Sequence, residues 1–299
     1  MKPNLHYDAT LLDNRDKFQD PFFKRFELRP ASAPLSLDGG VQKTYSFPTF
    51  YADVTCAIGI FHCDYERARA LMLHPRMRPI RMTRGRSLVL LSCYEYKNVM
   101  NVPPYNEIAM TIPVQVDPGI DVPVLPMVMG GFSKFGFYVF GMPVTSKENQ
   151  LRGNRIWGLP KVTEEIDVAM KDGDCVTTAR DAAGTPYFEL RVPATGKRTR
   201  FDVRANLYSA LDGKLLQSET SFQGTFAVNK HMKLLVQKGA RPERPYLTVG
   251  EGSFGRTLKE LLIEEQPFQT RFATGVNSAF GLPNPNYRIP EGMNPLRAT

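Results

Sequence analysis

Turn-forming residues interrupt this chain at short intervals, a composition that favours many turns and short strands over long helices. Lys171-Asp-Gly-Asp174 and Asp181-Ala-Ala-Gly-Thr185 separate three strand-like runs, and Asp212-Gly213 has the composition of another hairpin tip. The 299 residues include 23 glycines and 24 prolines, above the usual ~7% and ~5%. The pattern predicts an antiparallel meander that closes into a barrel, in a β-rich α+β fold with a few short helices.

Capping residues predict where these helices lie. Asp64 is placed to cap a helix that Pro75 ends, Thr145-Ser-Lys-Glu148 is typical of a capping box before a helix ending near Gly153, and Thr257-Leu-Lys-Glu260 repeats that pattern. Apolar runs predict strands at 87–96, 107–116 and 136–144, the first two joined as a hairpin, and alternation predicts a half-exposed strand over 162–170.

Composition places the chain among folded globular proteins. Hydrophobic residues make up 42% and charged residues 23%, which excludes a disordered chain. Residues 1–45 are rich in Pro, Asp, Lys and Ser without a sustained period, so we predict an N-terminal arm or cap, with a partly ordered tail as the alternative. Residues 46–299 are predicted to form a single domain. The N-terminus lacks the apolar stretch of a secretory signal, so we expect a cytoplasmic location.

Several function classes receive little support. The apolar region 122–144 contains Pro123, Gly130 and Lys134, so it predicts buried strands and no membrane helix. The four cysteines form no CxxC pair and are interpreted as reduced core thiols. The histidines lie far apart and show no i, i+4 pair, so no metal site is predicted, and the GxSxG turn of serine hydrolases is absent.

Two motifs could contact anionic ligands. Gly250-Glu-Gly-Ser-Phe-Gly255 is a literal GxGxxG, but no second strand with an acidic end follows it, so no nucleotide cofactor is expected. Arg76-Met-Arg-Pro-Ile-Arg-Met-Thr-Arg-Gly-Arg86 could hold a phosphate, a carboxylate or a nucleic-acid backbone. We favour a solvated loop there, because no aromatic residues are interleaved and the rest of the chain, with a net charge of +8, has no second cluster of basic residues that matches it. No nucleic-acid partner is therefore expected.

The segment Gly153-Asn-Arg-Ile-Trp-Gly-Leu-Pro-Lys161 is the most informative of the chain. Because Pro160 cannot sit inside a sheet, Lys161 is predicted at the first residue of the next strand, behind an apolar wall. Desolvation lowers the pKa of an ammonium group and can make the amine a nucleophile. From the residues alone, an ordinary surface lysine remains the alternative.

The segment resembles the Schiff-base lysine motif of the acetoacetate decarboxylase family, which reads roughly G-R-E-x-x-G-[YF]-P-K-K. Gly153, Gly158, Pro160 and Lys161 match it, and Lys161 takes the place of the imine-forming lysine. A second match is upstream, where Tyr105-Asn-Glu107 and Ile112-Pro-Val114 have the family's spacing. Glu107 thereby occupies the place of an active-site carboxylate.

The departures from the family pattern concern charged positions. Val162 stands where the family has a second lysine, Asn154-Arg155 replaces its Arg-Glu, and Ser92 aligns with a further family carboxylate. No clear counterpart of the family's N-terminal active-site arginine is found. Arg155 is therefore the candidate for the positive charge near the nucleophile. We predict Lys161 and Glu107 as catalytic, and as substrate-binding residues Tyr105, Trp157, Arg155 and Ser92.

The resemblance implies a homo-oligomeric Schiff-base lyase that acts on a small-molecule keto acid without metal or nucleotide. Acetoacetate decarboxylase is itself the established example of a lysine activated by desolvation or a neighbouring cation. The expected reaction is decarboxylation of a β-keto acid. An imine-dependent aldolase-dehydratase is one alternative, and a non-catalytic binding barrel that has lost the chemistry is another.

Overall fold

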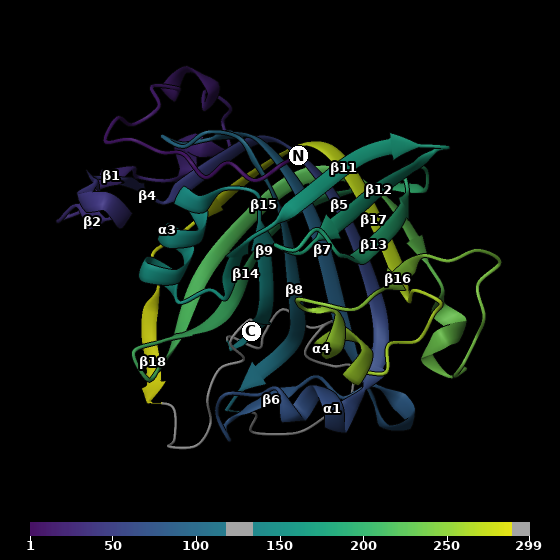
Figure 1. Ribbon diagram of the computed structural model, residues 1–299. Coiled ribbons are helices and arrows are strands. Elements are labelled where there is room, and N and C mark those ends of the chain that lie inside the picture. Colours follow the sequence, from purple (N-terminus) through teal and green to yellow (C-terminus); the bar gives the residue numbers. More distant parts are fainter. Residues whose placement is uncertain (118–133, 289–299) are drawn as a thin grey trace.

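Seven long strands close into a barrel in the computed structural model, which describes residues 1–117 and 134–288 (Figure 1). Neighbours pair in the order β9, β14, β15, β17, β5, β7 and β8, and β8 pairs with β9 to close the ring. These pairs are antiparallel except that β14 runs parallel to β9. The barrel strands are β5 (Thr49–Asp64), β7 (Arg86–Val99), β8 (Tyr105–Val116), β9 (Phe135–Val144), β14 (Lys197–Leu211), β15 (Lys214–Lys230) and β17 (Gln269–Phe280).

Short elements extend the barrel wall and its ends. Three helices are described, α1 (Tyr65–Ala70), α3 (Lys147–Trp157) and α4 (Gly255–Glu260). Three short strands pair with barrel strands: β6 (Met77–Pro79) with β8, β10 (Lys161–Thr163) with β9 and β18 (Asn284–Arg288) with β15. The 3-10 turns lie at Arg15–Lys17, Phe23–Arg25, Asp38–Gly40, Thr83–Gly85 and Met232–Leu235.

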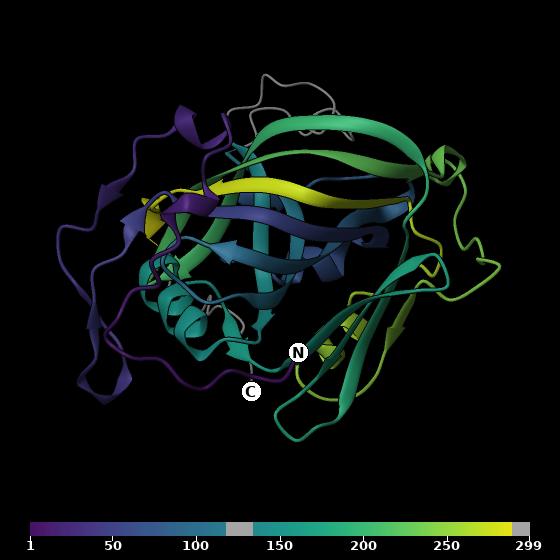
Figure 2. The same cartoon turned by 90° about the horizontal axis from the view of Figure 1, so that it is seen from above.

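A second, four-stranded antiparallel sheet lies beside the barrel (Figure 2). It contains β11 (Glu165–Lys171), β12 (Asp174–Arg180), β13 (Pro186–Pro193) and β16 (Leu247–Val249). The predicted turns at 171–174 and 181–185 connect its first three strands. The β-rich class, the closed barrel and the scarcity of helix confirm the predicted fold.

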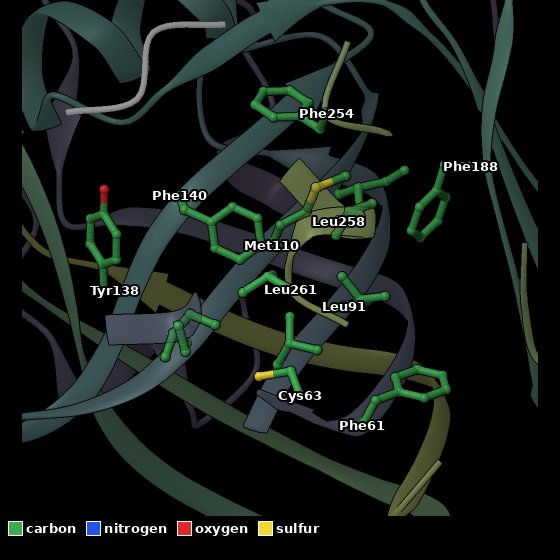
Figure 3. Close-up of a cluster of buried hydrophobic side chains, with 14 of the residues drawn as sticks. Phe61, Cys63, Leu91, Met110, Tyr138, Phe140, Phe188, Phe254, Leu258 and Leu261 are labelled. Carbon is green, nitrogen blue, oxygen red and sulfur yellow. The ribbon is translucent and has the colours of Figure 1, made fainter. Parts of the chain in front are cut away.

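Strands β5, β7 and β8 are buried on both faces. All twelve residues of β8 are buried, and successive side chains point to opposite faces. Ala109 and Thr111 line an internal cavity of the barrel, whereas Met110 belongs to the core between the barrel wall, the second sheet and α4. Figure 3 shows that core, with Met110 near Leu258 and Phe254. The continuous apolar runs in the sequence reflect this two-sided burial.

Residues 1–45 run along the α3 end of the barrel (Figure 1). Two short antiparallel pairs involve this part of the chain, β1 (Arg29–Pro30) with β4 (Ser46–Phe47) and β2 (Leu35–Ser36) with β3 (Gln42–Lys43). The Nζ atom of Lys43 lies 3.0 Å from Glu148 of α3, and Phe23 packs against Phe50 of β5. The segment therefore covers α3 and one barrel edge. Its separation from the domain at residue 45 stays a prediction.

Three local predictions need correction. Helix α3 begins after Ser146, whose hydroxyl accepts from the Asn149 amide, and it continues to Trp157 because Gly158 takes the left-handed conformation that ends it. The expected cap Thr145 instead accepts a hydrogen bond from the Asn106 amide of β8. Helix α4 starts at Gly255, because the buried Phe254 brings its first turn into the core.

The strand predicted over 162–170 is also wrong in one respect. It divides at Glu164, so that β10 extends the barrel and β11 begins the second sheet. The Glu164 side chain is buried and accepts hydrogen bonds from Tyr187 and Ser253 at 2.6 Å and 2.5 Å. These bonds fix the point at which the chain leaves the barrel.

The arginine-rich segment is more than a solvated loop. Arg86 is only 1% exposed, and its guanidinium donates to the main-chain carbonyls of Thr83, Leu234, Leu235 and Gln237. It also lies 3.3 Å from Glu264. Arg86 therefore joins the start of β7 to the loop after β15, which is a structural role.

Other predictions agree with the structure. Asp64 caps α1, strands β7 and β8 form the expected hairpin, and the four cysteines are buried and unpaired. Part of the apolar region 122–144 lies outside the described residues, and the rest is the buried strand β9. Within residues 1–117 and 134–288, none of the helices has the length and apolar character needed to span a membrane.

Candidate active site

The junction between α3 and β10 places Lys161 inside the barrel. Gly158 reverses the chain in the left-handed conformation, and a Cβ atom there would overlap the carbonyl of Ala210. The chain then passes Pro160 and pairs Lys161 with Met142 of β9. Lys161 is thus the first residue of a strand, as the sequence predicts, and its side chain is only 6% exposed.

Two residues of α3 hold this lysine. The Asn154 amide group bonds both main-chain groups of Lys161: its oxygen accepts from the Lys161 amide at 3.2 Å, and its nitrogen donates to the Lys161 carbonyl at 3.2 Å. Gly153 leaves space for the lysine stem, since a Cβ atom there would lie 2.6 Å from Cε of Lys161. Both residues precede the lysine in the motif segment, and they position it from the helix.

The side chain of Lys161 meets Glu107 at the wall of a cavity of about 200 Å³. The Nζ atom lies 2.6 Å from Oε2 of Glu107, and each side chain is 6% exposed. The other Glu107 oxygen, Oε1, accepts from the Tyr96 hydroxyl at 3.3 Å. The two predicted catalytic residues, 54 positions apart in the sequence, are therefore neighbours in space.

Burial dominates the electrostatics of the lysine. Desolvation lowers the pKa of Lys161 below its ordinary value of 10.5, the charge and hydrogen bond of Glu107 partly oppose this, and the charge of Arg152 lowers the pKa further. The amine therefore becomes neutral at lower pH than an exposed lysine. That is the requirement for a nucleophile.

The cation near the lysine is Arg152 and not Arg155. Arg155 is exposed, forms an ion pair with Asp38 at 2.6 Å and does not line the cavity, so its predicted role is not supported by its position. Arg152 is 1% exposed and donates to Asn149 and Thr49 at 3.2 Å and 3.1 Å. No sequence pattern singles it out, because Arg152 follows Glu148 by four residues on α3, a spacing typical of an exposed ion pair.

Position 162, where the family motif has its second lysine, faces away from the cavity. Val162 packs against the core outside the barrel, whereas Lys161 lines the cavity. Adjacent strand residues point to opposite faces, which accounts for the difference. Arg152 is thus the neighbour that contributes positive charge here.

Tyrosines surround the Lys161–Glu107 pair. The Lys161 Nζ atom lies 5.6 Å from the ring centroid of Tyr105, which is 1% exposed. Tyr105 does not line the cavity, so its predicted role in substrate binding is not supported by its position. The Tyr96 ring lies 4.9 Å from that of Tyr105 and 4.6 Å from that of Tyr51. Burial raises the pKa of Tyr96 well above 10, so its hydroxyl stays a donor to Glu107.

The other predicted substrate-binding residues, Trp157 and Ser92, both line the cavity. Trp157 stacks on Phe280 with ring centroids 5.0 Å apart, and its indole nitrogen donates to the Gly281 carbonyl at 2.8 Å. Ser92 is 7% exposed and lies on β7. The cavity walls are mainly aromatic and aliphatic, as expected of a site for a small organic molecule.

Comparison with known proteins identifies the family. Residues 32–263 match the family described as acetoacetate decarboxylase (ADC). The chain belongs to the acetoacetate decarboxylase family. Membership supports an enzyme of the lyase class, in agreement with the resemblance inferred from the two motifs. Among curated proteins, none matches the sequence.

Solved structures share the acetoacetate decarboxylase fold at low sequence identity. The acetoacetate decarboxylase of Legionella pneumophila subsp. pneumophila str. Philadelphia 1 has a TM-score of 0.57 and 11% identity, with 91% of this chain and 94% of that chain covered. Another acetoacetate decarboxylase has a TM-score of 0.55 and 11% identity, covering 81% and 90%. The enduracididine biosynthesis enzyme MppR, complexed with the condensation product of pyruvate and imidazole 4-carboxaldehyde, has a TM-score of 0.50 and 12% identity, with 79% of this chain and 89% of that chain covered.

The GxGxxG segment has a structural role in this member of the acetoacetate decarboxylase family. Strand β16, which precedes it, pairs antiparallel with β13, so the parallel βαβ unit of a dinucleotide site is not formed there. The Gly250 amide donates to the Tyr187 carbonyl, and the Ser253 hydroxyl donates to Glu164. The segment links the second sheet to α4. Within residues 1–117 and 134–288, no three His, Cys, Asp or Glu residues gather as metal ligands would.

Proposed function

We propose that this protein is a Schiff-base lyase that decarboxylates a β-keto acid through an imine on Lys161. The observation that carries the proposal is the buried Lys161–Glu107 pair, with Nζ and Oε2 2.6 Å apart at the wall of an apolar cavity. A lysine with a lowered pKa supplies the nucleophile, and an adjacent carboxylate can move protons.

The reaction begins when the neutral amine of Lys161 adds to the keto carbonyl. Loss of water leaves a protonated imine, with Glu107 relaying the protons. The bond between the α-carbon and the carboxylate carbon then breaks, CO2 leaves, and the electron pair moves into the imine to give a neutral enamine. A proton returned to the α-carbon re-forms the iminium. Water hydrolyses it, which releases the ketone and regenerates the lysine.

The cavity walls assist the carbon–carbon bond cleavage. Carboxylate charge is lost as CO2 forms, so an apolar surrounding disfavours the charged ground state more than the transition state. Tyr94, Phe222 and Leu207 supply such surroundings. Tyr96 donates to Glu107 and orients the carboxylate toward Lys161.

An aldolase-dehydratase reaction would use the same imine. The structurally similar MppR is complexed with a condensation product of pyruvate. In that case a proton leaves the imine's α-carbon, and the resulting enamine adds to a second carbonyl. We place this reaction second, because an acid that loses CO2 reaches the same enamine without a second substrate.

Borohydride trapping tests the imine. The protein is reduced in the presence of individual 2-oxo or 3-oxo acids, digested and examined by mass spectrometry. We expect added mass on the peptide that carries Lys161 and none in the Lys161→Ala variant. Lys43 provides an internal control, because it is also buried and is paired with Glu148 at 3.0 Å, but it lies outside the cavity.

The trapping outcome separates the alternatives. Equal labelling of the parent and the Lys161→Ala variant would overturn the assignment of the lysine. No labelling with any acid would favour the binding-barrel alternative. Gas analysis detects whether CO2 is released from 3-oxo acids. This release separates a decarboxylase from an aldolase-dehydratase. The homo-oligomeric state and the cytoplasmic location stay predictions.

A further inference from the structure

A second cation lines the cavity, on the strand opposite the Lys161–Glu107 pair. Arg271 lies on β17 and pairs in register with Ile58 of β5, which pairs with Ser92 of β7, which pairs with Ala109 of β8. All four side chains line the cavity, so they form one row across four strands. Below we call this set the arginine row.

The arginine row lies next to the row that contains the catalytic carboxylate. Glu107 of β8 pairs with Tyr94, and along β8 it is two residues from Ala109. Two residues along a strand correspond to about 7 Å, and neighbouring strands lie about 4.8 Å apart. The Cα atom of Arg271 thus lies in the row next to that of Glu107, and β17 is separated from β8 by β5 and β7 along the barrel wall. The reactive end and the arginine face the same enclosed space from different sides.

Arg271 has neutral partners among the described residues. Its Nε and one terminal nitrogen donate to Oε1 of Gln269 at 3.0 Å and 2.7 Å, and its guanidinium lies 4.9 Å from the ring centroid of Phe201. Among residues 1–117 and 134–288 no carboxylate forms an ion pair with it. A largely buried guanidinium without a counter-ion is costly unless something compensates its charge.

The two cations of the cavity differ in this respect. Lys161 is already neutralised by Glu107, whereas the fork of donors on Arg271 retains capacity for a carboxylate. Because Gln269 accepts two of those bonds on one side, the guanidinium is held in place in advance. An anion that enters the cavity would therefore find an oriented, incompletely satisfied cation.

We propose that Arg271 binds a second carboxylate of the substrate, one that the reaction retains. This inference rests on the proposed function and names its substrate class: a β-keto acid with a further carboxylate, separated from the reacting carbonyl by an apolar spacer of several bonds. The retained group must differ from the leaving one, because a carboxylate held by arginine is stabilised in its charged form and resists conversion to CO2. The aromatic walls suit the spacer.

A series of methyl ketones with a terminal carboxylate measures the spacing. The probes are 4-oxopentanoate, 5-oxohexanoate, 6-oxoheptanoate and 7-oxooctanoate, each compared with its methyl ester in borohydride trapping on Lys161. None carries a β-carboxylate, so trapping reports binding and imine formation without decarboxylation. We expect one length at which the acid is trapped at least about tenfold faster than its ester, the effect of one charge-assisted hydrogen bond or more.

Three variants identify the source of the preference. Arg271→Met should abolish the preference for the acid over its methyl ester. Arg271→Lys should keep part of that preference, because the positive charge remains. Ser92→Glu places a carboxylate in the arginine row, two strands from Arg271, and should also abolish the preference by neutralising the arginine. Arg155→Met removes an arginine outside the cavity and should leave the preference unchanged.

Failure of this inference differs from failure of the imine proposal. If esters are trapped on Lys161 as fast as the acids at every length, or if Arg271→Met keeps the preference, the carboxylate site is wrong and the imine stands. If nothing is trapped, the imine is wrong. Calorimetry of the four acids on the parent and on Arg271→Met then decides the carboxylate site, which is overturned if the two proteins bind them equally.

Discussion

The main chain of Gly153 lies directly against the side chain of Lys161. A Cβ atom at position 153 would lie 2.6 Å from Cε and 3.0 Å from Cγ of the lysine, closer than carbon atoms pack. Glycine in a helix interior costs about 1 kcal/mol relative to alanine. The acetoacetate decarboxylase motif begins with this glycine, and its role here is to let the helix approach the nucleophile.

The first prediction concerns this contact. Gly153→Ala should displace the Nζ atom of Lys161 from Glu107 and slow imine trapping by about a hundredfold, as expected when a reacting group moves by about 1 Å. The free energy of unfolding should change little, because the higher helix propensity of alanine offsets the cost of the strained contact. Trapping rates and thermal melts check this. Gly281→Ala is the control, since its added methyl would meet its nearest neighbour at an ordinary 3.5 Å.

The second prediction is that Arg152 supplies the positive charge that lowers the pKa of Lys161. Arg152→Met should therefore raise the pKa of Lys161, and the amine would then become neutral only at higher pH. The acidic limb of the pH profile for imine formation should move to higher pH. Val162→Lys should leave the limb in place, because residue 162 faces away from the cavity. A shift caused by Val162→Lys, or none caused by Arg152→Met, would contradict this assignment.

The third prediction concerns Glu107. Its charge and hydrogen bond raise the pKa of Lys161 relative to burial alone, so Glu107→Gln should move the acidic limb to lower pH, opposite to Arg152→Met. Turnover at the plateau should nevertheless fall by roughly a hundredfold, because general acid–base help is lost. Steady-state rates from pH 5 to 10 measure both effects. Glu164→Gln is a matched control, a buried carboxylate outside the cavity, and should alter neither.

Much of the barrel could be predicted from local sequence signals. Turn residues mark the ends of the strands of the second sheet, and apolar runs correspond to strands β7, β8 and β9 because these are buried on two faces or nearly so. The parallel pairing of β14 with β9, one of the pairings that make up the ring, has no local signal. The division at Glu164 was missed because alternation continues across it, although the two halves join different sheets.

The candidate site shows the same division between local and long-range information. Lys161 and Glu107 were found because each lies in a family motif. Arg152 was missed because a Glu and an Arg four residues apart on a helix are typical of an exposed pair, whereas the N-terminal segment buries both. Arg271 lies on a strand interrupted by bulges, so alternation does not indicate which side it faces. Only the register of four strands places it in the cavity.

The last prediction concerns the cost of the Lys161–Glu107 pair to the fold. Removing one partner of a buried ion pair can cost about 3–5 kcal/mol, whereas replacing both by well-packed hydrophobic residues of similar volume is often neutral or stabilising by about 1–4 kcal/mol. Lys161→Met should therefore lower the free energy of unfolding at pH 7, and the double variant Lys161→Met/Glu107→Leu should restore or exceed the parent value. Urea unfolding measures all three proteins.

The pH dependence of the single variant tests the cause. In Lys161→Met the buried Glu107 loses its cation, so an unpaired carboxylate remains in the interior, where an unpaired charge is costly. Acid removes the charge of a carboxylate, so the deficit relative to the parent should shrink on acidification. The double variant has no carboxylate at this site and should not show that trend. A deficit in Lys161→Met that is independent of pH would mean lost packing, and the pair would then carry no electrostatic cost to the fold.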